Sequence, residues 1–180
     1  MELRGDFLAL DDEALLDQCD VHIYKSSGPG GQHRNKVSSA VRLKHRPSGI
    51  SAHGDESRSQ HQNKRMALRR LRMNIACQLR RPVDPGKDRP PPIVTECLFV
   101  PRGVPLRAGR RIRIGTRDFR FWRVVAFLLD VLDALHGRMS DTAAYLGVTT
   151  GNVAALLKQD RHLFAAAQSI RRKHGQHPLL

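Results

Sequence analysis

The sequence predicts an α+β protein in which a small antiparallel sheet packs on one long helix and a mainly helical part follows. Two observations support this prediction. Short segments of alternating polarity, separated by turn residues, precede an amphipathic helical pattern over residues 59–81. A proline-rich stretch, residues 82–92, ends that pattern, and apolar residues recur at helical spacing after it. We therefore expect a domain at 1–81, a linker at 82–92 and a basic, mainly helical module at 93–180.

The first domain should begin with a short helix followed by three strands. Asp11 or Asp12 is expected to cap the helix, which runs to about Cys19. Alternating polarity then predicts strands at residues 21–24, 40–44 and 50–53. Pro47-Ser48-Gly49 supplies turn residues between the last two strands, which therefore form a hairpin.

The long helix over residues 59–81 should present an apolar face beside a basic one. The apolar face consists of Leu68, Leu71, Ile75 and Leu79. The neighbouring basic face consists of Arg65, Arg69, Arg72 and Arg80. This pattern predicts that the apolar face packs on the sheet.

The second part should hold a strand, a helix and a helix-turn-helix. Arg111–Ile114 alternates in polarity like a strand. Asp118 is expected to open an amphipathic helix that Gly137 ends. Residues 140–157 then look like a helix-turn-helix in which Gly147 forms the turn.

Two interpretations of this helix-turn-helix are open. In one, the second helix enters a groove of a nucleic acid. In the other, the turn only packs three helices together. Thr149–Leu157 contains no Lys or Arg, which favours the packing interpretation. Basic residues outside the turn, Lys158, Arg161 and the run at 171–173, are better placed for phosphates.

Charge makes a polyanion the first partner to consider. The 180 residues carry 31 Lys and Arg against 17 Asp and Glu, a net charge of +14. Fourteen of the basic residues lie between residues 25 and 81, and eight more lie between 101 and 123. Because aromatic residues make up only 5% of the chain, we expect contacts with phosphates rather than a platform for stacked bases. Nucleic acid is the predicted partner.

The sequence gives no support for a membrane or secreted protein. The longest apolar run, Val124–Leu129, has six residues, far fewer than the ~20 of a membrane span. The acidic N-terminus lacks the features of a signal peptide, so we expect a cytoplasmic protein. Cys19, Cys77 and Cys97 form no C-x-x-C pair and are expected to be reduced, partly buried thiols.

Metal and nucleotide chemistry are also not expected. Five histidines lie in the first domain: His22, His33, His45, His53 and His61. They form none of the spacings typical of zinc sites, so we expect polar surface groups or contacts to RNA. The glycine-rich segment at residues 28–31 is not followed by the Gly-Lys-Ser/Thr ending of a nucleotide phosphate loop. The sequence predicts neither a metal nor another cofactor.

The most informative motif is Ser-Ser-Gly-Pro-Gly-Gly-Gln-His-Arg-Asn-Lys at residues 26–36. Its adjacent Gly30 and Gly31 can adopt positive φ and allow the backbone to approach a bulky ligand. By themselves two glycines favour a simple tight turn. Further motifs follow in order: Ser39-Ala40-Val41-Arg42-Leu43, His45-x-Pro47-x-Gly49-Ile50 and Arg58-Ser59-Gln60-His61-Gln62-Asn63-Lys64.

Taken together, these motifs resemble the Gly-Gly-Gln domain of class I peptide chain release factors and of the related ribosome-rescue peptidyl-tRNA hydrolases. The resemblance covers roughly residues 20–80. It implies a sheet that carries the Gly-Gly-Gln loop and packs on a long helix. It also implies that the loop enters the peptidyl-transferase centre of the large ribosomal subunit and promotes hydrolysis of the ester between peptide and tRNA.

The resemblance assigns the catalytic role to Gly30, Gly31 and Gln32. In that family the backbone N–H of the glutamine stabilises the transition state or the leaving hydroxyl, and its side chain shapes the water pocket. The glycines supply the unusual backbone. Ester hydrolysis needs a positioned water and a stabilised oxyanion, neither of which demands an ionisable side chain from the protein.

Contacts to ribosomal RNA are expected around the loop, at the start of the long helix and near the C-terminus. The expected residues are Arg34, Lys36, Arg42, Arg58, Gln60, Lys64, Arg65, Arg171, Arg172 and Lys173. A solvated helix face accounts for the charges of the long helix equally well. Arg34 departs from the family, which more often has an apolar or small residue there.

The resemblance further predicts which type of release activity to expect. Only 29 residues precede Gly30, so we expect no codon-reading domain upstream, and residues 83–180 show no decoding tripeptide. This favours codon-independent release of peptides from stalled ribosomes. The alternative is a non-catalytic RNA- or DNA-binding protein that works through its helix-turn-helix. The sequence predicts no oligomeric state.

Overall fold

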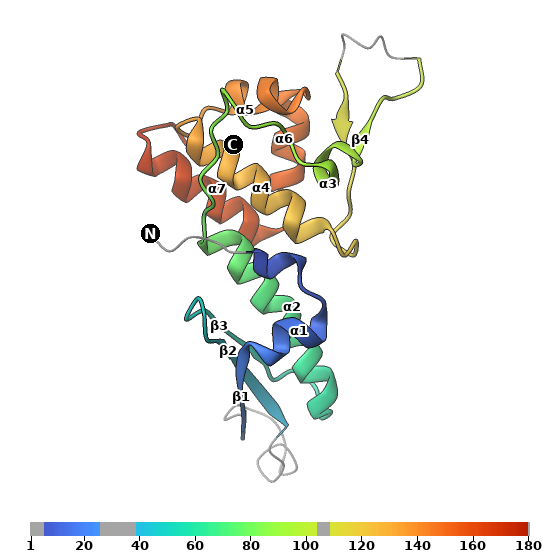
Figure 1. Ribbon diagram of the computed structural model, residues 1–180, viewed down its shortest axis with the longest axis vertical. Coiled ribbons are helices and arrows are strands. Elements are labelled where there is room, and N and C mark those ends of the chain that lie inside the picture. The colour runs from blue at the N-terminus through green and yellow to red at the C-terminus, as the bar shows by residue number, and fades with distance from the viewer. Residues whose placement is uncertain (1–5, 26–38, 104–108, 180) are drawn as a thin grey trace. The chain divides into compact units, whose positions relative to one another are not determined.

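The computed structural model describes residues 6–25, 39–103 and 109–179 (Figure 1). The chain forms two compact units, an N-terminal unit of residues 2–75 and a C-terminal unit of residues 76–180. The division between the two units lies within the long helix, after Ile75.

The N-terminal unit combines a three-stranded antiparallel sheet with helices, which confirms the predicted α+β class. Its elements are η1 (Asp6–Ala9), α1 (Asp12–Asp17), β1 (Cys19–Tyr24), β2 (Ala40–His45), β3 (Ser51–Gly54) and α2 (Gln60–Gln78). The strands pair in the order β1-β2-β3. Asp11 caps α1 by accepting a hydrogen bond of 2.8 Å from the Ala14 amide.

The core of this unit lies between α2 and one face of the sheet (Figure 1). Val41 and Leu43 of β2 are fully buried, as are Leu71 and Ile75 of α2. Gly54 allows the close approach of β3 to α2, since a Cβ there would lie 2.0 Å from the carbonyl oxygen of Asn63. The apolar face predicted for the long helix is therefore the face that packs.

The C-terminal unit is a helical bundle with a two-stranded ribbon. Its elements are α3 (Pro92–Thr95), β4 (Leu98–Phe99), β5 (Arg111–Ile112), α4 (Phe121–Ala134), α5 (Met139–Leu146), α6 (Thr150–Leu157) and α7 (Arg161–Lys173). Helix α4 contacts α3, α5 and α7, and helix α6 contacts α5, α7 and β5. The centre of the bundle holds fully buried side chains such as Phe121, Leu129, Leu157 and Leu163.

Three local features of this unit refine the sequence prediction. Helix α4 begins at Phe121 rather than at Asp118, whose carboxylate accepts the Arg120 amide at 2.9 Å in the preceding turn. Gly147 adopts the left-handed conformation with φ 66° and joins α5 to α6, as the predicted helix-turn-helix requires. Strand β4 is a new element, because two residues are too few for a recognisable alternation.

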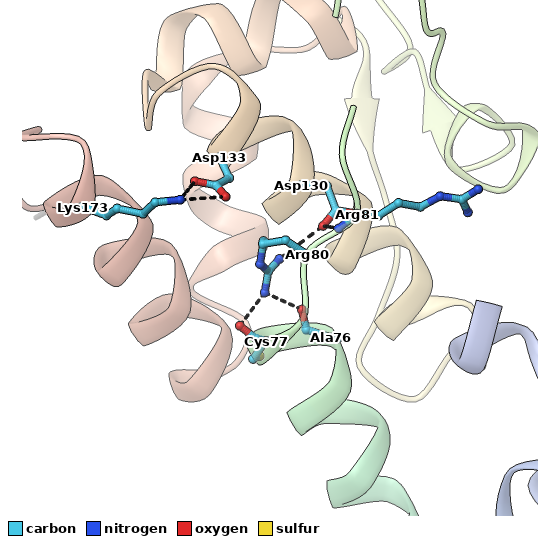
Figure 2. A network of polar contacts seen from close by, with 7 residues as sticks. All are labelled: Ala76, Cys77, Arg80, Arg81, Asp130, Asp133 and Lys173. Carbon is cyan, nitrogen blue, oxygen red and sulfur yellow. Dashed lines mark hydrogen bonds and ion pairs between the residues drawn. The ribbon is translucent and has the colours of Figure 1, made fainter. Parts of the chain in front are cut away.

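Arg80, which was predicted on the basic face of the long helix, is buried in the C-terminal unit (Figure 2). Its guanidinium lies 3.5 Å from the Asp130 carboxylate and donates to the carbonyl oxygens of Ala76 and Cys77 at the end of α2. The Arg81 amide donates to the same carboxylate at 3.1 Å. This network satisfies carbonyl groups that the end of a helix otherwise leaves free.

None of the helices within the described ranges combines the length and the apolar character needed to cross a bilayer.

Candidate functional site

The two ends of the segment that contains the Gly-Gly-Gln motif emerge from neighbouring strands. β1 and β2 pair along their full length, and their last partners are Tyr24 and Ala40. The segment that joins them includes residues 26–38, which lie outside the described residues, so the expected catalytic residues Gly30, Gly31 and Gln32 and the expected RNA contacts Arg34 and Lys36 are not described. The structure instead shows how the base of this segment is held.

Asn63 anchors the C-terminal end of that segment to α2. Its side chain is fully buried, and its amide nitrogen donates to the carbonyl oxygens of Ser39 at 2.7 Å and Ser57 at 2.8 Å. Its amide oxygen accepts the Ser57 N–H at 2.8 Å. One side chain thus joins the start of α2 to the chain on both sides of the β2–β3 hairpin.

No role was predicted for Asn63, although its spacing along the helix carried a signal. Asn63, Ala67, Leu71 and Ile75 recur every four residues and are all fully buried. A polar residue on the buried stripe of a helix must have internal partners. The four-residue spacing of Asn63 from Ala67, Leu71 and Ile75 was therefore the signal in the sequence for a positioning role.

We expect Asn63→Ala to lower the free energy of unfolding by about 1–3 kcal/mol, because the Ser57 amide loses its acceptor in a half-buried setting. Urea denaturation measures this loss, and hydrogen exchange at the Ser57 amide should accelerate. Asn74→Ala is the matched control, since the Asn74 side chain donates one hydrogen bond, to the Ser51 carbonyl oxygen at 2.9 Å. Equal stabilities of the two variants would contradict the anchoring role.

The outer face of the sheet gathers polar side chains around Arg42. Val41 and Leu43 point to the core, so Arg42 between them points outward and is exposed. Its register partners are His22 on β1 and His53 on β3. The Tyr24 hydroxyl reaches across the sheet to within 3.2 Å of Nδ1 of His53. Arg42 is thus available for a phosphate, as the RNA prediction requires.

The start of α2 presents most of the other residues expected to contact RNA. Ser59 caps the helix, with its hydroxyl accepting the Gln62 amide at 3.4 Å. Arg58, Gln60 and Arg65 are exposed there, and Lys64 is half-buried. The positive end of the helix dipole adds to their charge. These four side chains give the start of α2 a polar, basic character close in sequence to Asn63.

The three basic residues predicted near the C-terminus have three different environments. Arg171 was predicted to contact RNA, but its guanidinium is buried. It donates to the carbonyl oxygens of His177, at 3.0 Å, and Gly137. Lys173 pairs with Asp133 at 2.9 Å (Figure 2). Of these three residues, Arg172 is exposed and forms no ion pair within the part of the chain that the structure describes. Arg171 therefore has a structural role: it links α7 to the turn that follows α4 and to the chain beyond α7.

His45 is a second correction, because it was expected at the surface or against RNA. It is fully buried, with Nδ1 2.7 Å from the Ser48 hydroxyl and Nε2 3.0 Å from Oε1 of Gln18. Burial, and after it the charge of Arg46, lowers the pKa of His45. The ring is therefore neutral at pH 7 and holds the turn between β2 and β3 against α1.

The cysteines are free thiols in the structure. Burial raises the pKa of each one, and that of Cys77 to about 12, so none is a poised nucleophile. In the described part of the chain, no group of three or more His, Cys, Asp or Glu side chains is placed to hold a metal ion.

In a helix-turn-helix that binds nucleic acid, the start of the second helix reads the groove. Here polar side chains at the start of α6 make hydrogen bonds inside the C-terminal unit instead. The Asn152 side chain accepts the Ile112 amide at 2.9 Å and donates to the Ile112 carbonyl at 3.2 Å. The Thr149 hydroxyl caps α6 by accepting the Asn152 amide at 3.1 Å. These contacts favour the packing interpretation over groove reading.

Comparisons with known proteins assign the N-terminal part. A family model described as the RF-1 domain matches residues 13–89. Peptide chain release factor 1 of Chlamydia trachomatis serovar L2 is 46% identical over 67 residues, which are 36% of this chain and 19% of that protein. Peptide chain release factor 2 of Haemophilus ducreyi is 49% identical over 55 residues, 31% of this chain and 15% of that protein. Peptide chain release factor 1 of Gluconobacter oxydans is 48% identical over 59 residues, 33% of this chain and 17% of that protein.

The match thus spans about a fifth or less of each of these relatives. The family-model match, residues 13–89, includes the three-stranded sheet, the Gly-Gly-Gln segment, Asn63 and the whole of α2. Residues 13–89 therefore match the RF-1 domain of class I peptide chain release factors, and the Gly-Gly-Gln motif lies within that match.

Proposed function

We propose that this protein hydrolyses the ester of peptidyl-tRNA on the ribosome and does so without reading a stop codon. The observation that carries the proposal is the Gly30-Gly31-Gln32 triplet inside the matched RF-1 domain. Asn63 supports it, because this side chain holds the base of the segment on a packed helix. A catalytic loop gains from such a rigid base.

The reaction needs little from the protein beyond position and dipoles. The oxygen of a water attacks the ester carbonyl carbon, the bond to the tRNA 3′-oxygen breaks, and that oxygen takes up a proton. The carbonyl oxygen carries negative charge in the transition state, and a backbone N–H of Gln32 is our proposed donor to it or to the leaving oxygen. Gly30 and Gly31 let the backbone approach the ester closely. No cofactor takes part.

Ribosomal RNA is the proposed partner of the basic surface on the N-terminal unit. Arg42 on the sheet and Arg58, Gln60 and Arg65 at the start of α2 are exposed in positions suited to phosphate contacts. We propose that these residues, together with Lys64, Lys36 and Arg34, hold the domain at the peptidyl-transferase centre of the large subunit. Such a function places the protein in the cytoplasm, where translating ribosomes are found.

Codon independence is proposed because the part of the chain beyond the family match is a different kind of structure. The RF-1 match ends at residue 89, and a helical bundle with an arginine-bearing ribbon follows. We infer that this unit contacts RNA through charge rather than through base-specific reading.

We expect peptide release from ribosomes stalled at the end of a truncated mRNA to be at least as fast as release from ribosomes with a stop codon in the A site. The reason is that the proposed contacts involve rRNA and not the codon. Release of a radiolabelled dipeptide from matched complexes with a truncated message, a sense codon or a stop codon measures this. A strong preference for the stop-codon complex would overturn the rescue assignment and indicate decoding.

A further inference from the structure

The β4–β5 ribbon of the C-terminal unit has an inner and an outer face. Leu98 pairs with Ile112 on the inner face, and Ile112 is 3% exposed. Phe99 pairs with Arg111 on the outer face. Phe99 is 41% exposed, which is uncommon for so large an apolar side chain. The outer face therefore displays an aromatic ring with an arginine directly opposite.

A second arginine completes this arrangement. The guanidinium carbon of Arg113 lies 5.8 Å from the centroid of the Phe99 ring, within cation–π range. The Arg113 amide donates to the Cys97 carbonyl at 2.9 Å, which keeps the chain next to β4. Arg111 and Arg113 are both exposed. Phe99, Arg111 and Arg113 thus form one surface, here called the ribbon platform.

The helix-turn-helix holds the ribbon platform in place. Asn152 of α6 binds both backbone groups of Ile112, the residue between the two arginines. Arg110 forms a parallel bridge with Val148 of the turn. Gly109 has φ 115°, and a Cβ there would lie 2.7 Å from the Thr149 methyl group. The platform is therefore preorganised, so binding costs it little ordering.

The surroundings of the platform favour a polyanionic partner. From Cys97 to Arg117 the sequence has six arginines and no acidic residue. A second exposed phenylalanine, Phe119, provides a contrast. It also has a guanidinium 5.8 Å from its ring, but that group belongs to Arg120, which is paired with Asp118 at 2.9 Å. Within the described ranges Arg111 and Arg113 beside Phe99 form no ion pair with an acidic side chain, whereas the guanidinium beside Phe119 is neutralised by Asp118.

We propose that the ribbon platform binds single-stranded RNA, with an unpaired base stacked on Phe99 and the adjacent phosphates on Arg111 and Arg113. An aromatic face is useful to a base that has left its stack, and arginines hold the backbone on either side. In a duplex the bases are stacked on each other, so the ring would gain nothing. The choice of RNA over single-stranded DNA rests on the proposed function on the ribosome.

The test measures binding of the full-length protein to a fluorescent ten-nucleotide oligouridine by anisotropy, at several salt concentrations. We expect Phe99→Leu to weaken binding about tenfold, the scale for losing one base–aromatic stack, without changing the salt dependence. Arg111→Gln should lower the log–log salt slope by about 0.7, the value for one lost phosphate contact on a single strand. Phe99→Trp should bind oligouridine at least as tightly as the parent protein does.

Phe119→Leu is the matched control and should leave the affinity unchanged. Equal effects of Phe99→Leu and Phe119→Leu, in variants whose circular dichroism matches the parent, would overturn the proposal. So would tighter binding of an RNA duplex than of oligouridine, or tighter binding of oligothymidine. Because no ribosome is present, failure here is distinct from failure of peptide release.

Discussion

Replacing Gly31 with alanine should lower the rate of peptide release by about 10² or more, the scale for losing one preorganised oxyanion donor. A Cβ at this position both restricts φ and holds the backbone away from the ester. The binding surface of the domain is unchanged, so the loss should appear in the rate at saturating protein and not in the affinity for the ribosome. Single-turnover release from complexes with truncated mRNA separates the two quantities.

The matched control for this variant is Gly115→Ala. A Cβ at Gly115 has open space around it, and its φ lies outside the left-handed range. We expect Gly115→Ala to release peptide at the parent rate. A folded Gly31→Ala variant that does the same would show that the loop has no catalytic role, whatever the ribosome affinity.

Asp130→Ala should destabilise the C-terminal unit by about 3–5 kcal/mol, the cost of removing one partner from a buried ion pair. The Asp130 side chain is fully buried and the Arg80 side chain is 7% exposed, so the guanidinium would lose its carboxylate away from water. The Arg81 amide loses its acceptor as well. Urea denaturation followed by tryptophan fluorescence reports this loss, because Trp122 lies on the same helix.

Two further variants separate the buried charge from a simple loss of packing. Asp130→Leu combined with Arg80→Met should recover most of the stability, since apolar groups of similar size often replace a buried pair without cost. Asp141→Ala removes a pair with Arg138 whose side chains are 41% and 53% exposed, and should cost at most about 1 kcal/mol. An Asp130→Ala variant as stable as Asp141→Ala would contradict the proposed role of the network.

Two arginines have partners that no local pattern indicates. Arg80 was predicted on the basic face of the long helix and Arg171 as an RNA contact, yet each is buried against an oxygen atom of a residue far away in the sequence, Asp130 for Arg80 and Gly137 for Arg171. The low aromatic content argued against any stacking surface, but a percentage averages over the chain. It cannot show one exposed ring placed beside two arginines, as at Phe99.

The sequence by itself determined the three strands of the N-terminal sheet, the long helix, the helix-turn-helix and the family resemblance of the N-terminal part. These depend on local signals: side-chain alternation, helical periodicity, capping residues and turn glycines, each read within a few neighbouring positions. Only the tertiary structure decided that Asn63 anchors Ser39, that Asn152 clamps the ribbon and that His45 is buried. A polar side chain has the same chemistry whether it meets solvent, RNA or a distant carbonyl, and the choice among them is made by packing between segments far apart in the chain.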